Sequence, residues 1–157
     1  MHGYSIVGRR DCSEQENRGG ILALCKSSLT SAVVHITESL EAERMWHYLI
    51  MNSGIVVLCN WYRPGASDIS AITTFEHELN EHKLVSDHVF IAGDLNIHHK
   101  VWLRFSNDDT PEGDLLQSIC QSHSLKQFVQ QPTRGNYLLD LCLSDLNRSS
   151  AKFMLLS

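Results

Sequence analysis

An acidic residue and an amide stand two positions apart at the end of a predicted strand. Residues 89–93 form an apolar run, and Asp94-Leu95-Asn96 follows it directly. If the chain stays extended there, Asp94 and Asn96 share one face, and Gly93 lets a second backbone or a ligand approach closely. The carboxylate can accept a proton or orient a water, while the amide can donate to a negative oxygen. By itself the tetrapeptide also fits a turn, because Asp and Asn are common turn residues.

Polar residues also end two other predicted strands. Tyr62 closes an apolar run over residues 55–62, and Asp140 lies in the run over residues 138–143. Polar side chains that gather at one edge of a layered sheet form a candidate site. The neighbouring segments add imidazole, hydroxyl and guanidinium groups, namely Arg63, His98, Thr133 and Arg134.

The strands that must position these residues are short and apolar. A hairpin is predicted from residues 45–51 and 55–62, because Asn52-Ser53-Gly54 between them forms a short turn. Both arms are apolar on both faces, which indicates a sheet covered by other layers. Further strands are expected over residues 4–7, 21–25 and 32–36.

Two helices are expected between the strands. The first is predicted by Ile69, Ile72, Phe75 and Leu79 at helical spacing, with Ser67 or Asp68 available as its cap. The second opens with Thr110-Pro111-Glu112, which supplies a cap, a proline and an acid in the first turn. Strands interleaved with helices indicate a layered α/β or α+β domain.

Composition limits the classes of protein to which the chain can belong. Its 157 residues are 43% hydrophobic, which fits one folded domain and excludes a disordered or collagen-like chain. The net charge of −5 is unlike the basic footprint of proteins that hold DNA by counterion release. No apolar run approaches the ~20 residues that span a bilayer, and no secretory stretch opens the chain, so we expect an intracellular protein. Five cysteines without a C-x-x-C pair favour reduced thiols over a zinc site.

Several short motifs occur together in a fixed order. They are Trp61-Tyr62-Arg63-Pro64, Gly93-Asp94-Leu95-Asn96, Pro132-Thr133-Arg134 and Leu139-Asp140-Leu141. This series resembles the endonuclease/exonuclease/phosphatase superfamily, and most of all the apurinic-type endonuclease domain that precedes the reverse transcriptase of non-LTR retrotransposons. Arg9-Arg10-Asp11, Gly19-Gly20 and Glu43-Arg44-Met45-Trp46 resemble the same variety, so that the likeness covers roughly residues 3–146.

The resemblance implies a four-layer α/β/β/α sandwich that cleaves phosphodiester bonds in DNA with Mg²⁺. Mg²⁺ prefers carboxylate and water oxygens and stabilises the leaving oxygen. By analogy, Asp94 would position or deprotonate the attacking water, and Asn96 would hold that water or bond to the phosphate. Tyr62 and Thr133 would donate their hydroxyls to the phosphate, and Asp140 would orient a histidine.

Three further residues are weaker candidates for contact with the DNA backbone: His98, Arg63 and Arg134. The resemblance leaves the metal ligands of this chain and its oligomeric state unassigned. It implies no small-molecule cofactor, and it implies a nuclear location if the protein acts on DNA.

Two motifs of the family have no counterpart at the corresponding places. The family has a strand that ends in a metal-binding Gln-Glu before the region matched by residues 4–11, and a Ser-Asp-His after the region matched by Asp140. Gln15-Glu16 lies in a polar segment, and Ser86-Asp87-His88 precedes Asp94 and is predicted to connect a helix to a strand. We therefore expect a partial domain, incomplete at both ends, with little or no cleavage of its own, because loss of one member of a catalytic unit can remove most of its rate.

Two alternatives stay open. One is a phosphoesterase of small phosphates or lipids, which the same superfamily includes. The other is a remnant that is not an enzyme and either binds a partner or does nothing.

Overall fold

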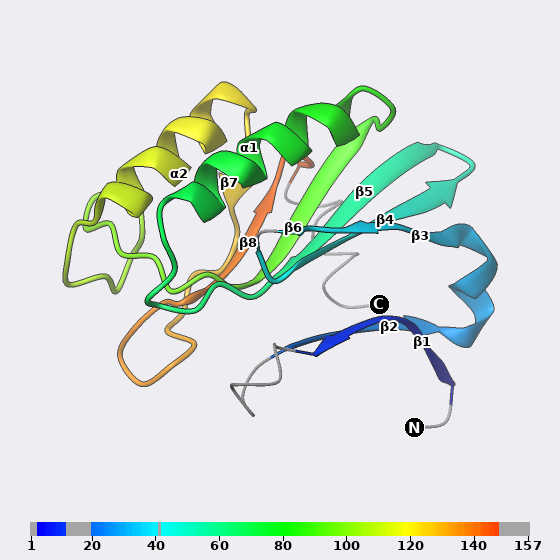
Figure 1. Cartoon of the computed structure of the whole chain (residues 1–157), viewed down its shortest axis with the longest axis horizontal. Coiled ribbons are helices and arrows are strands. Elements are labelled where there is room, and N and C mark those ends of the chain that lie inside the picture. The colour runs from blue at the N-terminus through cyan, green and yellow to red at the C-terminus, as the bar shows by residue number, and fades with distance from the viewer. Residues whose placement is uncertain (1–2, 12–19, 41, 148–157) are drawn as a thin grey trace.

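The structure is a computed structural model that describes residues 3–11, 20–40 and 42–147 (Figure 1). The described strands are β1 (Tyr4–Asp11), β2 (Gly20–Lys26), β3 (Val33–Glu38), β4 (Arg44–Met51), β5 (Gly54–Trp61), β6 (His88–Asp94), β7 (Lys126–Gln127) and β8 (Asp140–Ser144). The helices are the 3-10 helix η1 (Ser27–Ala32) and the α-helices α1 (Ser70–Lys83) and α2 (Pro111–Ser122). The predicted strands and helices are confirmed, with ends that differ by a few residues.

The main sheet has six strands in the order β3-β4-β5-β6-β8-β7. β4 and β5 form the predicted hairpin, in which Met51 pairs with Gly54. β5 and β6 are parallel, whereas β8 is antiparallel to β6. A parallel pair needs a crossover, and α1 supplies it between β5 and β6.

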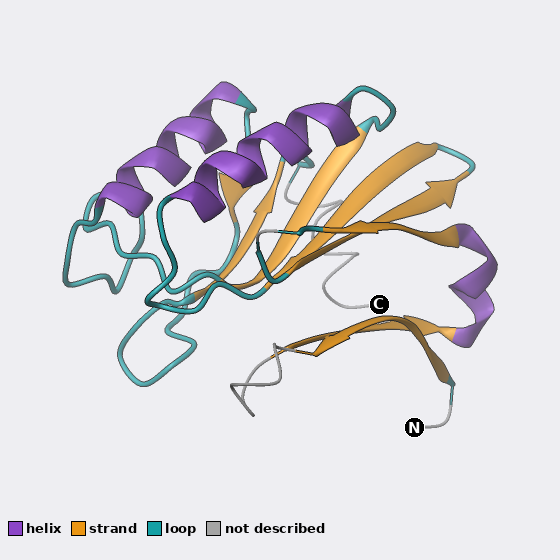
Figure 2. Ribbon diagram, viewed as in Figure 1, coloured by secondary structure: helices purple, strands orange, loops and turns teal. Residues whose placement is uncertain are grey.

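The helices and a second hairpin lie on opposite faces of this sheet. α1 and α2 cover one face, and the β1–β2 hairpin lies under the other (Figure 2). The core between helices and sheet includes Trp61, Phe75 and Leu116, each at most 1% exposed. The described residues thus form three layers of a mixed α/β fold, and the four-layer sandwich stays a prediction.

Both α-helices begin close to the predicted places. Thr110 caps α2, because its Oγ1 accepts a hydrogen bond from the Gly113 N–H at 3.2 Å. α1 begins at Ser70, whose N–H donates to Asp68 Oδ1 at 2.8 Å. Asp68 therefore serves the first turn as expected, although Ile69 occupies the cap position itself.

The remaining predictions on local structure have different outcomes. Ser86-Asp87-His88 connects α1 to β6 as predicted, and Asp87 Oδ2 accepts a hydrogen bond from the Ile55 N–H at 2.8 Å. Cys25, Cys59, Cys120 and Cys142 are free thiols. Cys12 and Gln15-Glu16 lie outside the described residues. Within the described ranges, no helix has the length and apolar character needed to cross a membrane.

Candidate active site at one edge of the sheet

The sheet topology brings the three predicted strand ends to one edge. β5 and β6 are parallel, so Tyr62 and Asp94 emerge at the same side of the sheet. Asp140 reaches that side differently, because it begins β8, which runs antiparallel to β6, and pairs in register with Asp94. The expectation that Asp140 ends its strand was wrong, yet the predicted gathering of polar residues at one edge is confirmed.

Asn96 does not continue the strand, contrary to the extended geometry considered from the sequence. β6 ends at Asp94, and Asn96 has a left-handed φ of 47°, a conformation that Asn tolerates better than most residues. Its Nδ2 donates to the backbone oxygen of Arg63 at 2.9 Å. The amide is therefore fixed by the loop after β5 and does not share a strand face with Asp94.

Gly93 allows the close backbone approach that the sequence predicts. A Cβ at this position would lie 1.7 Å from the backbone oxygen of Trp61. Only glycine can therefore bring β5 and β6 together directly before Asp94.

The Asp94 carboxylate is the most constrained group at this edge. Its side chain is 14% exposed, and Oδ2 accepts a hydrogen bond from Arg134 Nη2 at 2.7 Å. Oδ1 is buried without a hydrogen-bond partner among the described residues. Because the Asp140 side chain projects from the paired position, two like charges stand opposite each other, which is unfavourable without a cation. Arg134 supplies one positive charge.

Thr133 organises the loop that leads into β8. Its Oγ1 accepts hydrogen bonds from the backbone N–H groups of Leu139 and Asp140, at 3.2 and 3.0 Å. A hydroxyl has two lone pairs and one hydrogen, so these two bonds leave its O–H to donate. The loop-shaping role and the predicted donation to a phosphate are compatible.

Arg63 is buried, which differs from the exposed phosphate contact expected for it. It is 3% exposed, and its Nη2 donates to the backbone oxygen of Ser67 at 2.8 Å and lies 3.5 Å from Glu112. Burial lowers its pKa, and the negative charge of Glu112 opposes this shift. The guanidinium connects the loop after β5 to α2 and therefore positions other residues of the site.

Tyr62 and His98 differ in the contacts that their side chains make. Tyr62 packs against the small cluster of Ile21, Ala23 and Met45, and its hydroxyl has no hydrogen-bond partner within the described part of the chain. His98 Nδ1 lies 3.4 Å from Ser106 Oγ, and its ring meets that of Tyr137 edge-on at 6.2 Å.

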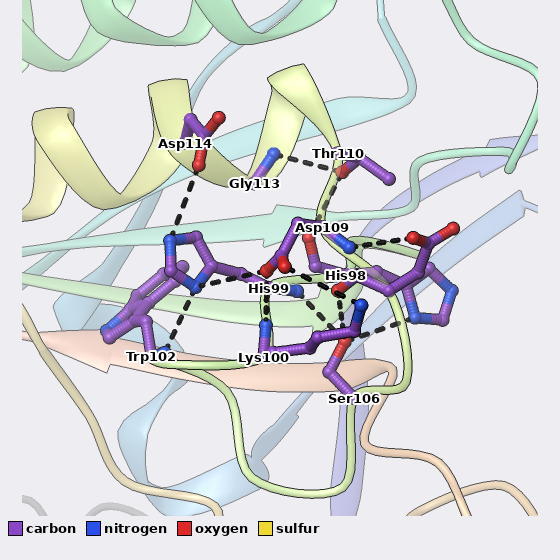
Figure 3. A network of polar contacts seen from close by, with 10 residues as sticks. His98, His99, Lys100, Trp102, Ser106, Asp109, Thr110, Gly113 and Asp114 are labelled. Atoms are coloured by element: carbon purple, nitrogen blue, oxygen red, sulfur yellow. Dashed lines mark hydrogen bonds and ion pairs between the residues drawn. The ribbon is translucent and has the colours of Figure 1, made fainter.

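His99 belongs to a network that the sequence does not reveal. The His99 ring is buried, its Nδ1 accepts a hydrogen bond from the Trp102 N–H at 3.0 Å, and its Nε2 lies 3.5 Å from Asp114 (Figure 3). The rings of His98 and His99 point in different directions (Figure 3). Only the alternation of neighbouring side chains could have hinted that one of them anchors this loop.

The described residues offer a small set of possible metal ligands. No group of three His, Cys, Asp or Glu side chains that could hold an ion occurs among them. Asp94 and Asp140 nevertheless provide two carboxylates, one with a buried oxygen that lacks a partner. Mg²⁺ is usually bound by one or two carboxylates together with waters and substrate phosphates, so the two fit a site that a phosphate completes.

Comparison with known proteins identifies the family. A family model described as "Endonuclease-reverse transcriptase" matches residues 56–153, which is more than half of the chain. The chain belongs to this endonuclease-reverse transcriptase family. The match contains Tyr62, Asp94, Thr133 and Asp140, and it confirms the resemblance to retroelement endonucleases. No curated protein matches the chain.

Two solved structures share the fold of this family member. The endonuclease domain of TRAS1, a telomere-specific non-LTR retrotransposon, matches with a TM-score of 0.64 and 14% identity, over 91% of this chain and 67% of that one. A mannosyl-6-phosphatase of Bacteroides thetaiotaomicron VPI-5482 matches with a TM-score of 0.57 and 6% identity, over 92% of this chain and 63% of its own. At such identities the likeness shows the fold alone.

Proposed function

We propose that this chain is an endonuclease domain of the retroelement type that cleaves phosphodiester bonds in DNA with a divalent metal ion. The observation that carries the proposal is the Asp94 carboxylate, which has a buried oxygen without a partner and stands opposite Asp140. Two carboxylates held together at the edge of a sheet favour a cation and a phosphate at the same place. The family to which the chain belongs supports the same reaction.

Each residue has a role that its geometry permits. Asp94 orients or deprotonates the attacking water, and Asp140 shares with it the charge that attracts the metal. Asn96, which is fixed by the Arg63 carbonyl, keeps one amide hydrogen for a water or a phosphate oxygen. Tyr62 and Thr133 donate their hydroxyls to the phosphate. Mg²⁺, when bound, neutralises phosphate charge and stabilises the leaving oxygen.

Arg134 serves a second purpose at this site. Its side chain is 63% exposed, and its Nη2 donates to Asp94 Oδ2 at 2.7 Å. A planar guanidinium binds phosphate as readily as carboxylate. We expect Arg134 to turn to the incoming DNA backbone, which frees Asp94 for the water. His98 is a further candidate for this contact, whereas Arg63 acts as a positioning residue.

We further propose that the 157-residue chain cleaves DNA slowly. The Gln-Glu and Ser-Asp-His motifs of the family have no counterpart at the corresponding places in this sequence. Asp140 then lacks the histidine that it would orient, and the metal lacks a carboxylate. The loss of one member of a unit that acts together costs most of the rate.

A plasmid-nicking assay tests the proposal. We expect slow conversion of supercoiled to nicked DNA with Mg²⁺, none with EDTA, and a loss of at least about 100-fold in Asp94→Ala. Glu81→Gln, on an exposed carboxylate of α1, serves as the matched control and should retain the wild-type rate. Equal rates in the wild type and in Asp94→Ala would refute the nuclease, and rapid nicking would refute the expected incompleteness.

A second candidate is a phosphoesterase of small phosphates. The fold likeness to a mannosyl-6-phosphatase is the observation that favours it. Release of inorganic phosphate from sugar or inositol phosphates, without nicking of DNA, would reverse the order of the two proposals.

A further inference from the structure

Two sequence motifs that the proposed function leaves unused meet in the structure. They are Arg9-Arg10-Asp11 at the end of β1 and Glu43-Arg44-Met45-Trp46 around the start of β4. Arg10 Nε donates a hydrogen bond to Glu43 Oε2 at 2.9 Å, across 33 positions of the chain. The contact lies beside Tyr62, because the Tyr62 N–H donates to the backbone oxygen of Glu43 at 2.9 Å.

The Arg10 guanidinium also holds the segment before β4 at two further points. Its Nη1 donates to the backbone oxygen of Ser39 and lies 3.8 Å from Glu38 Oε2. The planar fork of a guanidinium directs several donors in fixed directions, which the point charge of an ammonium does not do. One side chain of the hairpin therefore holds Glu38, Ser39 and Glu43 together.

Tyr62 receives a second support from the same part of the hairpin. Arg10 pairs in register with Ile21 of β2. Tyr62 packs against the small cluster that contains Ile21 and Ala23. The backbone of Tyr62 is thus held through Glu43 and its ring through Ile21, and both of these residues neighbour Arg10.

The surroundings of Arg10 argue against direct contact with DNA. Its side chain is 18% exposed and faces Glu38 and Glu43, so two carboxylates surround its single positive charge. Arg9, the preceding residue of β1, points to the other face of the strand, is 66% exposed and lies 3.0 Å from Asp11. Of the two arginines, only Arg9 has the exposure that a phosphate contact needs, whereas Arg10 binds groups of the protein itself.

We propose that Arg10 is a positioning residue for Tyr62. Because it ties the hairpin to the segment before β4, it fixes the backbone and the ring of Tyr62, and with them the place of the Tyr62 hydroxyl near Asp94. This inference rests on the proposed function, since the hydroxyl needs a phosphate to act on. A residue without contact to the substrate can still affect the rate strongly, because a misplacement of about 1 Å can cost up to ~100-fold.

Fluorine NMR of the full chain labelled with 3-fluorotyrosine tests the position of Tyr62 without any cleavage. The chain has four tyrosines, and the signal that is lost in Tyr62→Phe is that of Tyr62. We expect Arg10→Ala to shift or broaden this resonance. Glu43→Gln weakens the same contact from the other side and should change the resonance in the same direction by less. Arg9→Ala, on the exposed face of the same strand, is the matched control and should leave the resonance in place.

A double substitution connects the position of Tyr62 to the reaction. With Mg²⁺ under single turnover, we expect Arg10→Ala to lower the rate of plasmid nicking by about tenfold. In the Tyr62→Phe background the same substitution should change the rate by less than about twofold, because the hydroxyl that it displaces is already absent. A residue that contributed only to stability would lower both rates by the same factor.

The outcomes separate this inference from the proposed function. An unchanged Tyr62 resonance in both Arg10→Ala and Glu43→Gln would overturn it, as would equal rate factors in the two backgrounds. If Arg10→Ala does not fold, Glu43→Gln takes its place in both experiments. A displaced resonance in a chain that does not nick DNA would support the placement of Tyr62 by Arg10 while refuting the nuclease.

Discussion

The two faces of the six-stranded sheet are covered to different extents. On the helix face, Ile72, Phe75 and Leu79 of α1 are fully buried, and the Phe75 ring stacks on Trp61 with centroids 4.7 Å apart. On the hairpin face, Ile6, Leu22 and Leu24 are 63%, 51% and 40% exposed. An apolar cavity of about 380 Å³ also lies between this hairpin and the sheet.

The candidate active site depends mainly on the better-covered face. β5 and β6 are held from the helix side, and their ends carry Tyr62 and Asp94. The hairpin contributes Ile21 and Ala23 to the small cluster under Tyr62. Substitutions on the helix face should therefore lower the free energy of unfolding strongly, whereas substitutions on the hairpin face should lower it little.

Truncation of a core residue should give the largest difference between the faces. We expect Phe75→Ala to lower the free energy of unfolding by about 3–5 kcal/mol, because it leaves a cavity in a fully buried cluster. Leu24→Ala, its matched partner on the exposed hairpin, should cost less than about 1 kcal/mol. Urea denaturation measures both, and equal losses would contradict the difference.

Two glycines allow a finer comparison of the faces. Gly93→Ala places a Cβ against the backbone of Trp61, which cannot move without separating β5 from β6, so we expect a loss of about 3 kcal/mol. A Cβ at Gly8 in the hairpin would instead lie 2.7 Å from Nε2 of the His47 side chain. The clash there is with a side chain and not with backbone, so Gly8→Ala should cost less than Gly93→Ala, about 1–2 kcal/mol. Thermal unfolding should rank the two variants in this order.

The thermal stability of the protein should depend on pH through His82, which is buried on the helix face of the sheet. Burial lowers the pKa of His82 below its ordinary value of 6.5, with nearby Glu78 and Glu81 opposing the shift. The folded state therefore prefers neutral His82, and its contribution is fully present above about pH 6.5 and is lost as the pH falls. We expect the melting temperature to drop between about pH 7.5 and pH 5.5, and to drop less in His82→Gln.

The control for this titration lies on the same helix. His77 is 76% exposed and lies 3.4 Å from Glu81, so it differs from His82 in burial. A His77→Gln variant should keep the wild-type pH dependence. If both variants behaved alike, burial of His82 would not be the cause.

The smallest effect is expected from charges placed on the hairpin. Ile6→Lys and Leu22→Lys change exposed side chains of β1 and β2 and should alter the free energy of unfolding by about 0.5 kcal/mol or less. They should, however, reduce binding of a hydrophobic dye, because these residues belong to the exposed apolar surface. A large loss of stability in either variant would show that these side chains are buried and not exposed.

A buried ion pair shows why the helix face was hard to predict in detail. Arg44 is fully buried, and its guanidinium binds both oxygens of Glu78 at 2.9 and 3.1 Å. Burial alone would raise the pKa of Glu78, but the hydrogen bonds and charge of Arg44 outweigh it and lower the pKa. Sequence spacing does not reveal this pair, because Arg44 and Glu78 lie 34 positions apart and no local pattern connects them.

The sequence by itself determined the elements of this protein and the order of its motifs. Apolar spacing, the Asn52-Ser53-Gly54 turn and the Thr110 cap are local signals, and local signals act within a few residues. They were sufficient to predict the mixed α/β fold and to place Asp94 and Asp140 at strand ends. The family was predicted separately, from the resemblance of the ordered motifs to a known superfamily.

Tertiary structure alone decided how these residues serve one another. The register between β6 and β8 places Asp94 opposite Asp140, and the turn at Asn96 directs its amide to Arg63. Burial then turns Arg63 into a positioning residue. These features depend on contacts between segments far apart in the chain, where side chains find acceptors, charges and space that sequence spacing does not encode.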